Sequence, residues 1–592
     1  MITREEAMTR LTAPGAPFEI RVETVPAGTG RGEPMAVYAR RQRSLGELVR
    51  ASAEYGEREY LVTERSRLSF AGHYAAVAAL AAALRDEHGV GQGDRVAICS
   101  ANNPEWIIAF WAAVSLGAIA VGMNSMWAAP EIAYGLSLTT PKVVVADAPR
   151  RTLIADVAGA SGAADVPVLS STGGTAFPMH GGLPSPIPPG PRTPRGMPDG
   201  KANISDMLSV EEDLPAIFTR YAGAALPPDP VAEDDPAVIL FTSGTSGRPK
   251  GAVHSHRNVL AALWFMLLGD AVAAELGAPQ AERRFLLVSP LFHIASLHNL
   301  AVPRLAVGDT AVIHLGRFDI DRVLRLVEAE RVTNWGAMPT MLSRLVEHPD
   351  LGKYDLSSLR AVSVNSAPSS AELKARVRET LPLAGHAFGT TYGLTESSTA
   401  ATLATAADLL ADPDTVGGPI PAMEVEIRDA AGSPVPDGTE GEICLRGAQM
   451  MLGYWNDPEA TAASSAPQGW FRTGDLGTRS GGQLRVSARR SDLILRGAEN
   501  VYPAEVENAI AGHPAVAECA VLGLPHRDLG EEVAAIAVLR DGATVTEHDL
   551  IGYASGRLGR YKVPSRWLIT KDPLPRNATG KVIRPAAAAL LR

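Results

Sequence analysis

One short stretch near the middle of the chain limits what the protein can fold into and bind. Residues 237–241 form an apolar run, which predicts a buried strand. Small hydroxyl residues interleaved with glycine follow at once, and such a loop turns backbone N–H groups toward an anion with O–H donors beside them. The spacing excludes a Walker P-loop, and a flexible Ser/Gly surface turn is an equal alternative on composition alone. The predicted phosphate-binding residues are Thr242, Ser243, Gly244, Thr245, Ser246, Gly247 and Lys250.

The residues of this loop, Thr-Ser-Gly-Thr-Ser-Gly-Arg-Pro-Lys-Gly at 242–251, resemble the phosphate-binding loop of the adenylate-forming superfamily. That superfamily includes acyl-CoA synthetases, luciferases and the adenylation domains of peptide synthetases. Each of its motifs is weak alone, but the ordered set identifies the chain as a member, with the form of an acyl-CoA synthetase. The other motifs follow in family order at residues 365–368, 391–396, 470–475, 488–494, 496–503, 561–564 and 575–581.

The resemblance implies roles for individual residues. Lys581 matches the catalytic lysine, Glu396 the ligand of Mg²⁺ and Thr395 a hydroxyl for the α-phosphate, and His293 joins them as a catalytic candidate. One carboxylate suffices because magnesium takes its other ligands from phosphate oxygens and water. The remaining residues expected to bind nucleotide or coenzyme are Ser366, Ala367, Pro368, Gly389, Thr390, Thr391, Tyr392, Gly393, Asp475, Arg489, Arg496 and Lys562. Among them, the ring of Tyr392 is expected to face adenine, and the carboxylate of Asp475 is expected to accept hydrogen bonds from the ribose hydroxyls.

The chain departs from the family pattern at several of these motifs. Asn365 and Ser366 replace two glycines of the loop along adenine, which predicts a reshaped acyl pocket. Ala488 and Ala498 each replace a glycine. Ser491 stands at the hinge about which the family rotates its small domain, where Asp or Lys is usual.

The implied chemistry has two steps. A carboxylate attacks the α-phosphate of ATP to give acyl-AMP and pyrophosphate, and coenzyme A then displaces AMP. Catalysis of this kind rests on positioning and on neutralising the charge that spreads in the transition state. The expected cofactors are therefore ATP, Mg²⁺ and coenzyme A.

The acid is predicted to be apolar. Amino-acid-activating relatives have an Asp where this chain has His293, so an α-amino acid is disfavoured. The candidate pocket segments carry no Lys or Arg for a second carboxylate, which favours a medium-to-long fatty acid or a bulky ring acid. Leu297 stands where some long-chain members have an aromatic gate. The pocket segments are Trp264–Leu268, His293–Asn299, Trp335–Met341 and Ser363–Ser366.

Two rival functions stay open at this point. A fatty acyl-AMP ligase stops at the adenylate and loads a carrier protein, and the acyl-CoA form of residues 496–503 argues against it. A non-catalytic nucleotide-binding module is the rival from another class, and the retained motif residues argue against that. A metal site built from His254, His256, His293 and His298 is set aside because no acid or Cys completes it.

Composition narrows partners and location. The net charge is −10 without a long basic cluster, which disfavours nucleic acid. Three cysteines of unrelated spacing, Cys99, Cys444 and Cys519, indicate a reducing cytoplasm. Residues 106–123 lack charge, but we predict a buried helix and strand there rather than a membrane span. No secretory signal is predicted at the N-terminus, and peripheral membrane contact and a homodimer are left open.

The 592 residues exceed one ordinary core, so we expect two domains. Helices between short apolar strands predict an α/β class with mostly parallel sheets. The large N-terminal domain, residues 1–490, is expected to hold two such α/β subdomains and a β-rich subdomain that begins near Met423. A small, mobile α+β domain is expected at 491–592, and the Pro/Gly-rich residues 172–201 are read as an insertion.

Overall fold

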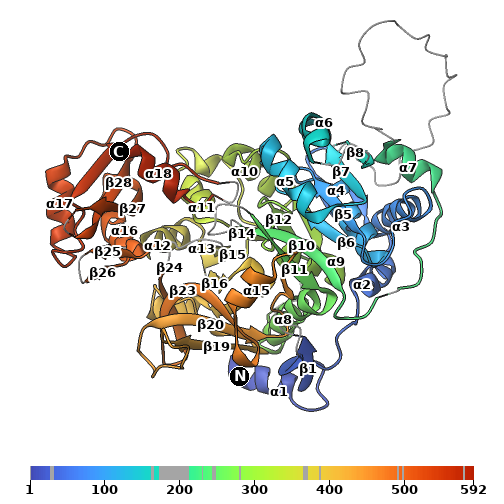
Figure 1. The fold of residues 1–592 in the computed structure, drawn as a ribbon, viewed down its shortest axis with the longest axis horizontal. Coiled ribbons are helices and arrows are strands. Elements are labelled where there is room, and N and C mark those ends of the chain that lie inside the picture. The colour runs from blue at the N-terminus through green and yellow to red at the C-terminus, as the bar shows by residue number, and fades with distance from the viewer. Residues whose placement is uncertain are drawn as a thin grey trace, which may run out of the picture.

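The computed structural model describes most of the chain, and the statements below concern those residues. They are residues 2–26, 32–161, 166–172, 212–229, 231–242, 249–278, 282–364, 371–385, 388–489, 492–496, 499–527, 529–577 and 580–591. A large body contains an eight-stranded sheet, a nine-stranded sheet and a β-rich part, and a smaller C-terminal body lies at one end of it (Figure 1). The predicted insertion lies outside the described residues except for Thr172.

The first sheet has eight strands and holds the phosphate-loop strand. It is parallel from β10 to β9, whereas β11 and β21 are antiparallel. In order its strands are β21 (Gly453–Tyr454), β11 (Lys250–Ser255), β10 (Pro236–Thr242), β6 (Ile119–Gly122), β5 (Arg95–Cys99), β7 (Val143–Asp147), β8 (Val168–Ser171) and β9 (Glu212–Asp213). The helices of this part are α3 (Phe70–Asp86), α4 (Pro104–Ser115), α5 (Ala129–Thr139), α6 (Ala148–Ser161) and α7 (Leu214–Arg220).

The second sheet has nine strands and takes two of them from far away in the sequence. The central run from β16 to β3 is parallel. In order the strands are β18 (Gly418–Pro419), β17 (Ala400–Ala404), β16 (Gly389–Gly393), β15 (Ala361–Val364), β14 (Asn334–Ala337), β12 (Arg284–Leu287), β13 (Thr310–Ile313), β3 (Glu59–Thr63) and β4 (Arg67–Ser69). The helices are α8 (His256–Glu275), α9 (Val302–Val307), α10 (Ile320–Ala329), α11 (Pro339–Val346), α12 (Ala371–Thr380) and α13 (Pro382–Gly385).

A β-rich part and an N-terminal segment complete the large body. The β-rich strands are β19 (Met423–Arg428), β20 (Gly441–Gly447), β22 (Ser465–Ala466), β23 (Trp470–Ser480) and β24 (Gln483–Arg489), with α14 (Ala406–Ala411) and α15 (Pro458–Ser464) beside them. The N-terminal segment contributes α1 (Arg4–Thr12), the hairpin of β1 (Ile20–Pro26) and β2 (Gly32–Tyr38), and α2 (Leu45–Ser52). We predicted no helices or strands for this segment from the sequence.

The small C-terminal body is an α+β unit around a separate core. Its five strands are β25 (Ile494–Arg496), β26 (Glu499–Val501), β27 (Val516–His526), β28 (Gly530–Leu539) and β29 (Arg566–Thr570), and its helices are α16 (Pro503–Ala511), α17 (Glu547–Ser555) and α18 (Arg584–Leu590). Val506, Ile510 and Val533 are among its fully buried residues. The predicted fold class, with two mostly parallel sheets, a β-rich part and a small α+β domain, is confirmed.

The uncharged stretch 106–123 is a buried helix followed by a buried strand, as predicted. The side chain of Asn103 caps α4 by accepting the Trp106 N–H at 2.7 Å, and every residue from 106 to 123 is buried. We predicted this strand from Gly117, but it starts at Ile119, because the glycine turns the chain with φ of +72°. Among the described helices, α8 alone is long and apolar enough to cross a membrane, and half of its apolar window is buried inside the protein.

Candidate active site

The two ends of the predicted phosphate loop face each other across a hairpin. Thr242 ends β10, Lys250 begins β11, and the two residues are paired in register. The loop between them, with Ser243, Gly244, Thr245, Ser246 and Gly247, lies outside the described residues. Because β10 continues the parallel sheet through β6, the loop leaves the sheet at the carboxyl end of its strands, where ligands of α/β folds bind.

The next motif runs from strand β16 into a single 3₁₀ turn, η5 (Thr395–Ser397). Gly393 is required at the bend, because a Cβ there would lie 2.3 Å from the Thr399 carbonyl oxygen. The Ser397 hydroxyl then accepts the Leu394 N–H at 2.9 Å and closes the turn. This bend separates the strand residues Gly389, Thr390, Thr391 and Tyr392 from the turn residues Thr395 and Glu396.

Thr390 has a structural contact that its predicted nucleotide role does not include. Its hydroxyl is buried and donates to the Val364 carbonyl at 3.0 Å, which ties β16 to β15.

Glu396 is held by a segment that sequence reasoning missed. Its carboxylate accepts a hydrogen bond from the Tyr454 hydroxyl at 2.8 Å, and its backbone carbonyl accepts the Met451 N–H at 2.8 Å. The Lys250 ammonium lies 5.0 Å from the centre of the same Tyr454 ring. The pair Gly453-Tyr454 is the sequence signal that could have pointed to this tyrosine, and such a pair is a weak signal.

The predicted adenine and ribose residues are joined directly. The Tyr392 hydroxyl donates to Asp475 at 2.8 Å, across 83 residues of sequence. Asp475 is buried and is the cross-strand partner of Arg489 in the antiparallel pair β23–β24. Strand register thus places the two residues predicted for ribose and phosphate side by side.

Lys581 approaches the large body at His293. The Nε2 atom of His293 is buried without a hydrogen-bond partner among the described residues, and burial lowers the pKa of this imidazole to about 3, with the positive charge of Lys581 contributing. The preceding Gly580, at φ +74°, lies so close that a Cβ there would stand 3.2 Å from the Thr340 hydroxyl and 3.5 Å from Met338 Sδ. The structure therefore brings the tip of the small body onto the large one beside a neutral histidine.

Further contacts join the two bodies away from this tip. Arg540 pairs with Glu347 and lies 3.6 Å from Glu372, and the Tyr502 hydroxyl donates to Glu440.

Other predicted residues lie on the small body or outside the described residues. Lys562 is held by Glu505 on α16 at 2.7 Å, which raises the pKa of its ammonium although burial opposes the shift. Arg496 ends β25 and is half-buried. Ser366, Ala367, Pro368 and the hinge residue Ser491 lie outside the described part of the chain.

Two side chains of the predicted pocket segment Trp264–Leu268 pack against the N-terminal helix α1. Trp264 and Leu268 are buried in a core cluster with α1, and the Trp264 indole donates to Gln42 at 2.9 Å. These two side chains of the predicted pocket segment therefore face α1, because a helix turns successive side chains to different faces. Phe265, from the same segment, packs instead against the core cluster that also takes Tyr392.

The four histidines considered as a metal site do not gather around one point. His254 and His298 meet edge to face with ring centres 5.2 Å apart, and burial lowers the pKa of both imidazoles, that of His298 to about 4. His256 accepts the Leu45 N–H at 3.1 Å, facing α2. Among the described residues no group of three His, Cys, Asp or Glu is placed to hold a metal ion.

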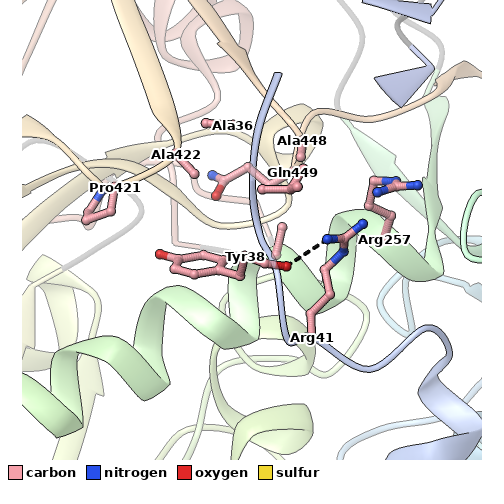
Figure 2. Close-up of a pocket in the computed structure, with 10 residues that line it drawn as sticks. Ala36, Tyr38, Arg41, Arg257, Pro421, Ala422, Ala448 and Gln449 are labelled. Atoms are coloured by element: carbon pink, nitrogen blue, oxygen red, sulfur yellow. Dashed lines mark hydrogen bonds between the residues drawn. The ribbon is translucent and has the colours of Figure 1, made fainter. Parts of the chain in front are cut away.

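A hollow lies between the N-terminal hairpin, α8 and the β-rich part (Figure 2). Its two guanidinium groups are already engaged, because Arg41 and Arg257 pair with Glu23 and Glu233, and Arg41 also donates to the Tyr38 carbonyl at 2.7 Å. The lining residues include none that the sequence assigned to ATP, metal or coenzyme. We take this region as a structural ion network.

Comparison with known proteins agrees with this geometry. Residues 48–455 match the model of the AMP-binding enzyme family, and residues 505–581 match the model of the AMP-binding enzyme C-terminal domain. The chain belongs to the AMP-binding enzyme family. The first match alone covers more than half of the protein and reaches from α2 to β21, so it includes both ends of the phosphate loop and Glu396.

Individual relatives of this AMP-binding enzyme are CoA ligases. The chain is 35% identical over 509 residues to a feruloyl-CoA synthase of an Amycolatopsis species, covering 86% of this chain and 91% of the relative. It is 32% identical over 498 residues to a long-chain-fatty-acid–CoA ligase of Mycobacterium tuberculosis, covering 84% and 88%. The solved o-succinylbenzoate CoA synthetase of Bacillus subtilis, in complex with an acyl-adenylate intermediate, superposes with a TM-score of 0.72 at 27% identity, covering 92% and 97%.

The AMP-binding enzyme is thus an adenylate-forming acid–thiol ligase, an acyl-CoA synthetase that uses ATP and coenzyme A. This confirms the family and the reaction class expected from the motifs, and it selects the CoA ligase over both rival functions.

Proposed function

We propose that this ligase activates an apolar monocarboxylic acid, either a medium-to-long fatty acid or a bulky ring acid, and transfers it to coenzyme A. The observation that carries the proposal is the packing of Gly580, at the tip of the small body, against Thr340 and Met338 of the large one, which brings the charge of Lys581 within electrostatic reach of His293. It puts one positive charge beside a neutral imidazole at the start of segment 293–299, which contains no charged residue. A carboxylate bound there would have Lys581 as its charged partner.

Two neighbouring groups of residues would position ATP for this reaction. Asp475, with Tyr392 and Arg489 beside it, would accept the ribose hydroxyls. Glu396 and Lys250, which meet at Tyr454, fit a metal-bound phosphate chain, because they offer one hard oxygen ligand and one ammonium donor. When bound, Mg²⁺ would neutralise charge on the pyrophosphate that leaves. Lys581 would then stabilise the charge that develops at the carboxylate and α-phosphate oxygens.

We also propose a cytoplasmic location. Cys99, Cys444 and Cys519 are all free thiols, and burial raises the pKa of Cys99 to about 12, which keeps it protonated. Unpaired cysteines are typical of a reducing compartment.

The acid class is tested by offering the purified protein ATP, Mg²⁺ and coenzyme A with a panel of acids. The panel contains straight-chain acids, hydroxycinnamates, fused-ring propanoates, o-succinylbenzoate as a dicarboxylate, and an amino acid. We expect kcat/KM for the best apolar monoacid to exceed that for the dicarboxylate by about a hundredfold, because the pocket would bury a second charge without a partner.

Pyrophosphate release measures the first step of the panel experiment, and mass spectrometry identifies the thioester. A dicarboxylate or an amino acid as the best substrate would overturn the proposed acid class. Pyrophosphate release without any thioester would overturn coenzyme A as the acceptor.

A second expected result concerns the ribose site. Asp475→Asn should weaken AMP binding by about tenfold to a hundredfold, because a charge-assisted pair of hydrogen bonds becomes a neutral one. Titration calorimetry with AMP measures this directly. Asp412→Asn is the control, since this carboxylate pairs with Arg485 at 2.7 Å on the surface and should leave AMP affinity unchanged. Equal AMP affinity in Asp475→Asn and the parent would refute the ribose role.

A further inference from the structure

The segment that carries Tyr454 is fixed along its whole length against the active site. Strand β21 pairs with β11 at the edge of the eight-stranded sheet, with Tyr454 opposite Ala252. The Leu452 N–H donates to the Val253 carbonyl at 2.8 Å, and the Tyr454 N–H donates to the Thr461 hydroxyl at 2.9 Å. Strand pairing on one side and α15 on the other therefore set the direction of the tyrosine side chain.

This one side chain contacts both charged residues that the site offers to a metal-bound phosphate. Its hydroxyl donates to Glu396 Oε1 at 2.8 Å, and its ring centre lies 5.0 Å from Lys250 Nζ. An ammonium at that distance is attracted by the negative face of an aromatic ring. Tyr454 is thus the physical link between β11, where the phosphate loop ends, and the turn η5 that presents the carboxylate.

The link matters because opposite charges in a small site tend to pair with each other. Among the described residues no salt bridge joins Lys250 to Glu396, and each is instead engaged by the tyrosine. The hydroxyl occupies one lone pair of Oε1, and no described residue donates a hydrogen bond to Oε2, the oxygen that would face a cation. The Met451 N–H also donates to the backbone carbonyl of Glu396 at 2.8 Å, so this residue is held at its backbone and at its carboxylate.

We propose that Tyr454 is a positioning residue for the ATP half-reaction. Its hydroxyl orients the carboxylate of Glu396 toward the metal, and its ring holds the ammonium of Lys250 toward the phosphates. This rests on the proposed function, in which Glu396 is the ligand of Mg²⁺. Partners of this kind fix the geometry of a metal ligand, and their loss typically costs about tenfold to a hundredfold in metal affinity.

Calorimetric titration of ATP without any acid tests the proposal, since no turnover occurs. The dissociation constant is measured with saturating Mg²⁺ and again in EDTA, and the ratio of the two reports how much the metal strengthens binding. Tyr454→Phe removes the hydroxyl and keeps the ring, so this ratio should fall about tenfold while affinity in EDTA stays within about threefold. Tyr454→Leu removes the ring as well, and it should also weaken binding in EDTA, because Lys250 loses its support.

Two further variants separate the possible outcomes. Tyr354→Phe is the matched control, because its hydroxyl also donates to a carboxylate, Asp321, but on α10 away from the site. It should change neither constant. Glu396→Gln should abolish the Mg²⁺ enhancement, and if it does not, the proposed role of Glu396 fails. If Glu396→Gln loses the enhancement while Tyr454→Phe keeps it, the positioning role of Tyr454 is overturned. Circular dichroism spectra confirm that each variant is folded.

Discussion

Lys581→Ala is expected to slow adenylate formation by about a hundredfold to a thousandfold, the usual cost of removing one group that stabilises transition-state charge. The lysine stands on the small body directly after Gly580, which packs onto Thr340 and Met338, and its charge reaches His293. The loss should appear in kcat for pyrophosphate release.

The second half-reaction separates a catalytic role from a structural one. When acyl-AMP and coenzyme A are supplied directly, Lys581→Ala should form thioester at close to the parent rate, because the α-phosphate has already been attacked. Lys571→Ala is the matched control, since Lys571 is an exposed lysine of the same body. Equal losses in both half-reactions, or an equal loss in the control, would contradict the assignment.

Much of the fold could be predicted because strand and helix patterns are local. The apolar runs of β5 and β19 indicate strands, and the amphipathic pattern of residues 319–329 indicates the helix α10, whose first turn is capped by the side chain of Asp319. The membership of β3 and β4 in the second sheet could not be predicted. Both strands precede the first sheet in sequence. Strand β3 pairs with β13, about 250 residues further on, and β4 pairs with β3, and hydrophobic periodicity carries no information about such distant pairing.

The residues of the site likewise divide into those found from sequence motifs and those placed only by the fold. Asp475 and Arg489 were found because each belongs to a sequence motif, and the register of β23 and β24 then placed them together. Tyr454 was missed because its role depends on β21 reaching the edge of the sheet beside β11. The packing of Trp264 against α1 could not be predicted, because the sequence does not show that α1 covers that face of α8.

A second large effect is expected on stability in mild acid. Four imidazoles, those of His73, His254, His256 and His298, are fully buried, and burial lowers their pKa, to about 3 for His73 and about 4 for His256 and His298. In the unfolded chain each takes up a proton below about pH 6.5, whereas in the folded chain it stays neutral. These groups therefore leave the free energy of unfolding unchanged above about pH 6.5. They lower it progressively as the pH falls from there toward the folded pKa.

The size of the effect follows from the same linkage. Near pH 5.5 each buried histidine costs about 1.4 kcal/mol relative to pH 7.5, so the four together lower the free energy of unfolding by about 5.5 kcal/mol. This is about ten-thousandfold in the folding equilibrium. Urea unfolding, followed by the fluorescence of the buried Trp106 and Trp111, measures the difference between the two pH values in the part of the protein that holds these histidines.

His73→Phe tests the origin of this acid sensitivity. The imidazole packs edge-on against Tyr60 at 4.8 Å between ring centres, and neither of its nitrogens has a partner among the described residues, so a phenyl ring replaces it without losing a hydrogen bond. The variant should narrow the stability difference between the two pH values by about 1.4 kcal/mol. His548→Gln, on the exposed side of α17, should leave the difference unchanged. His73→Met serves if the larger ring disturbs folding, and an unaltered difference in a folded His73 variant would show that the acid sensitivity arises elsewhere.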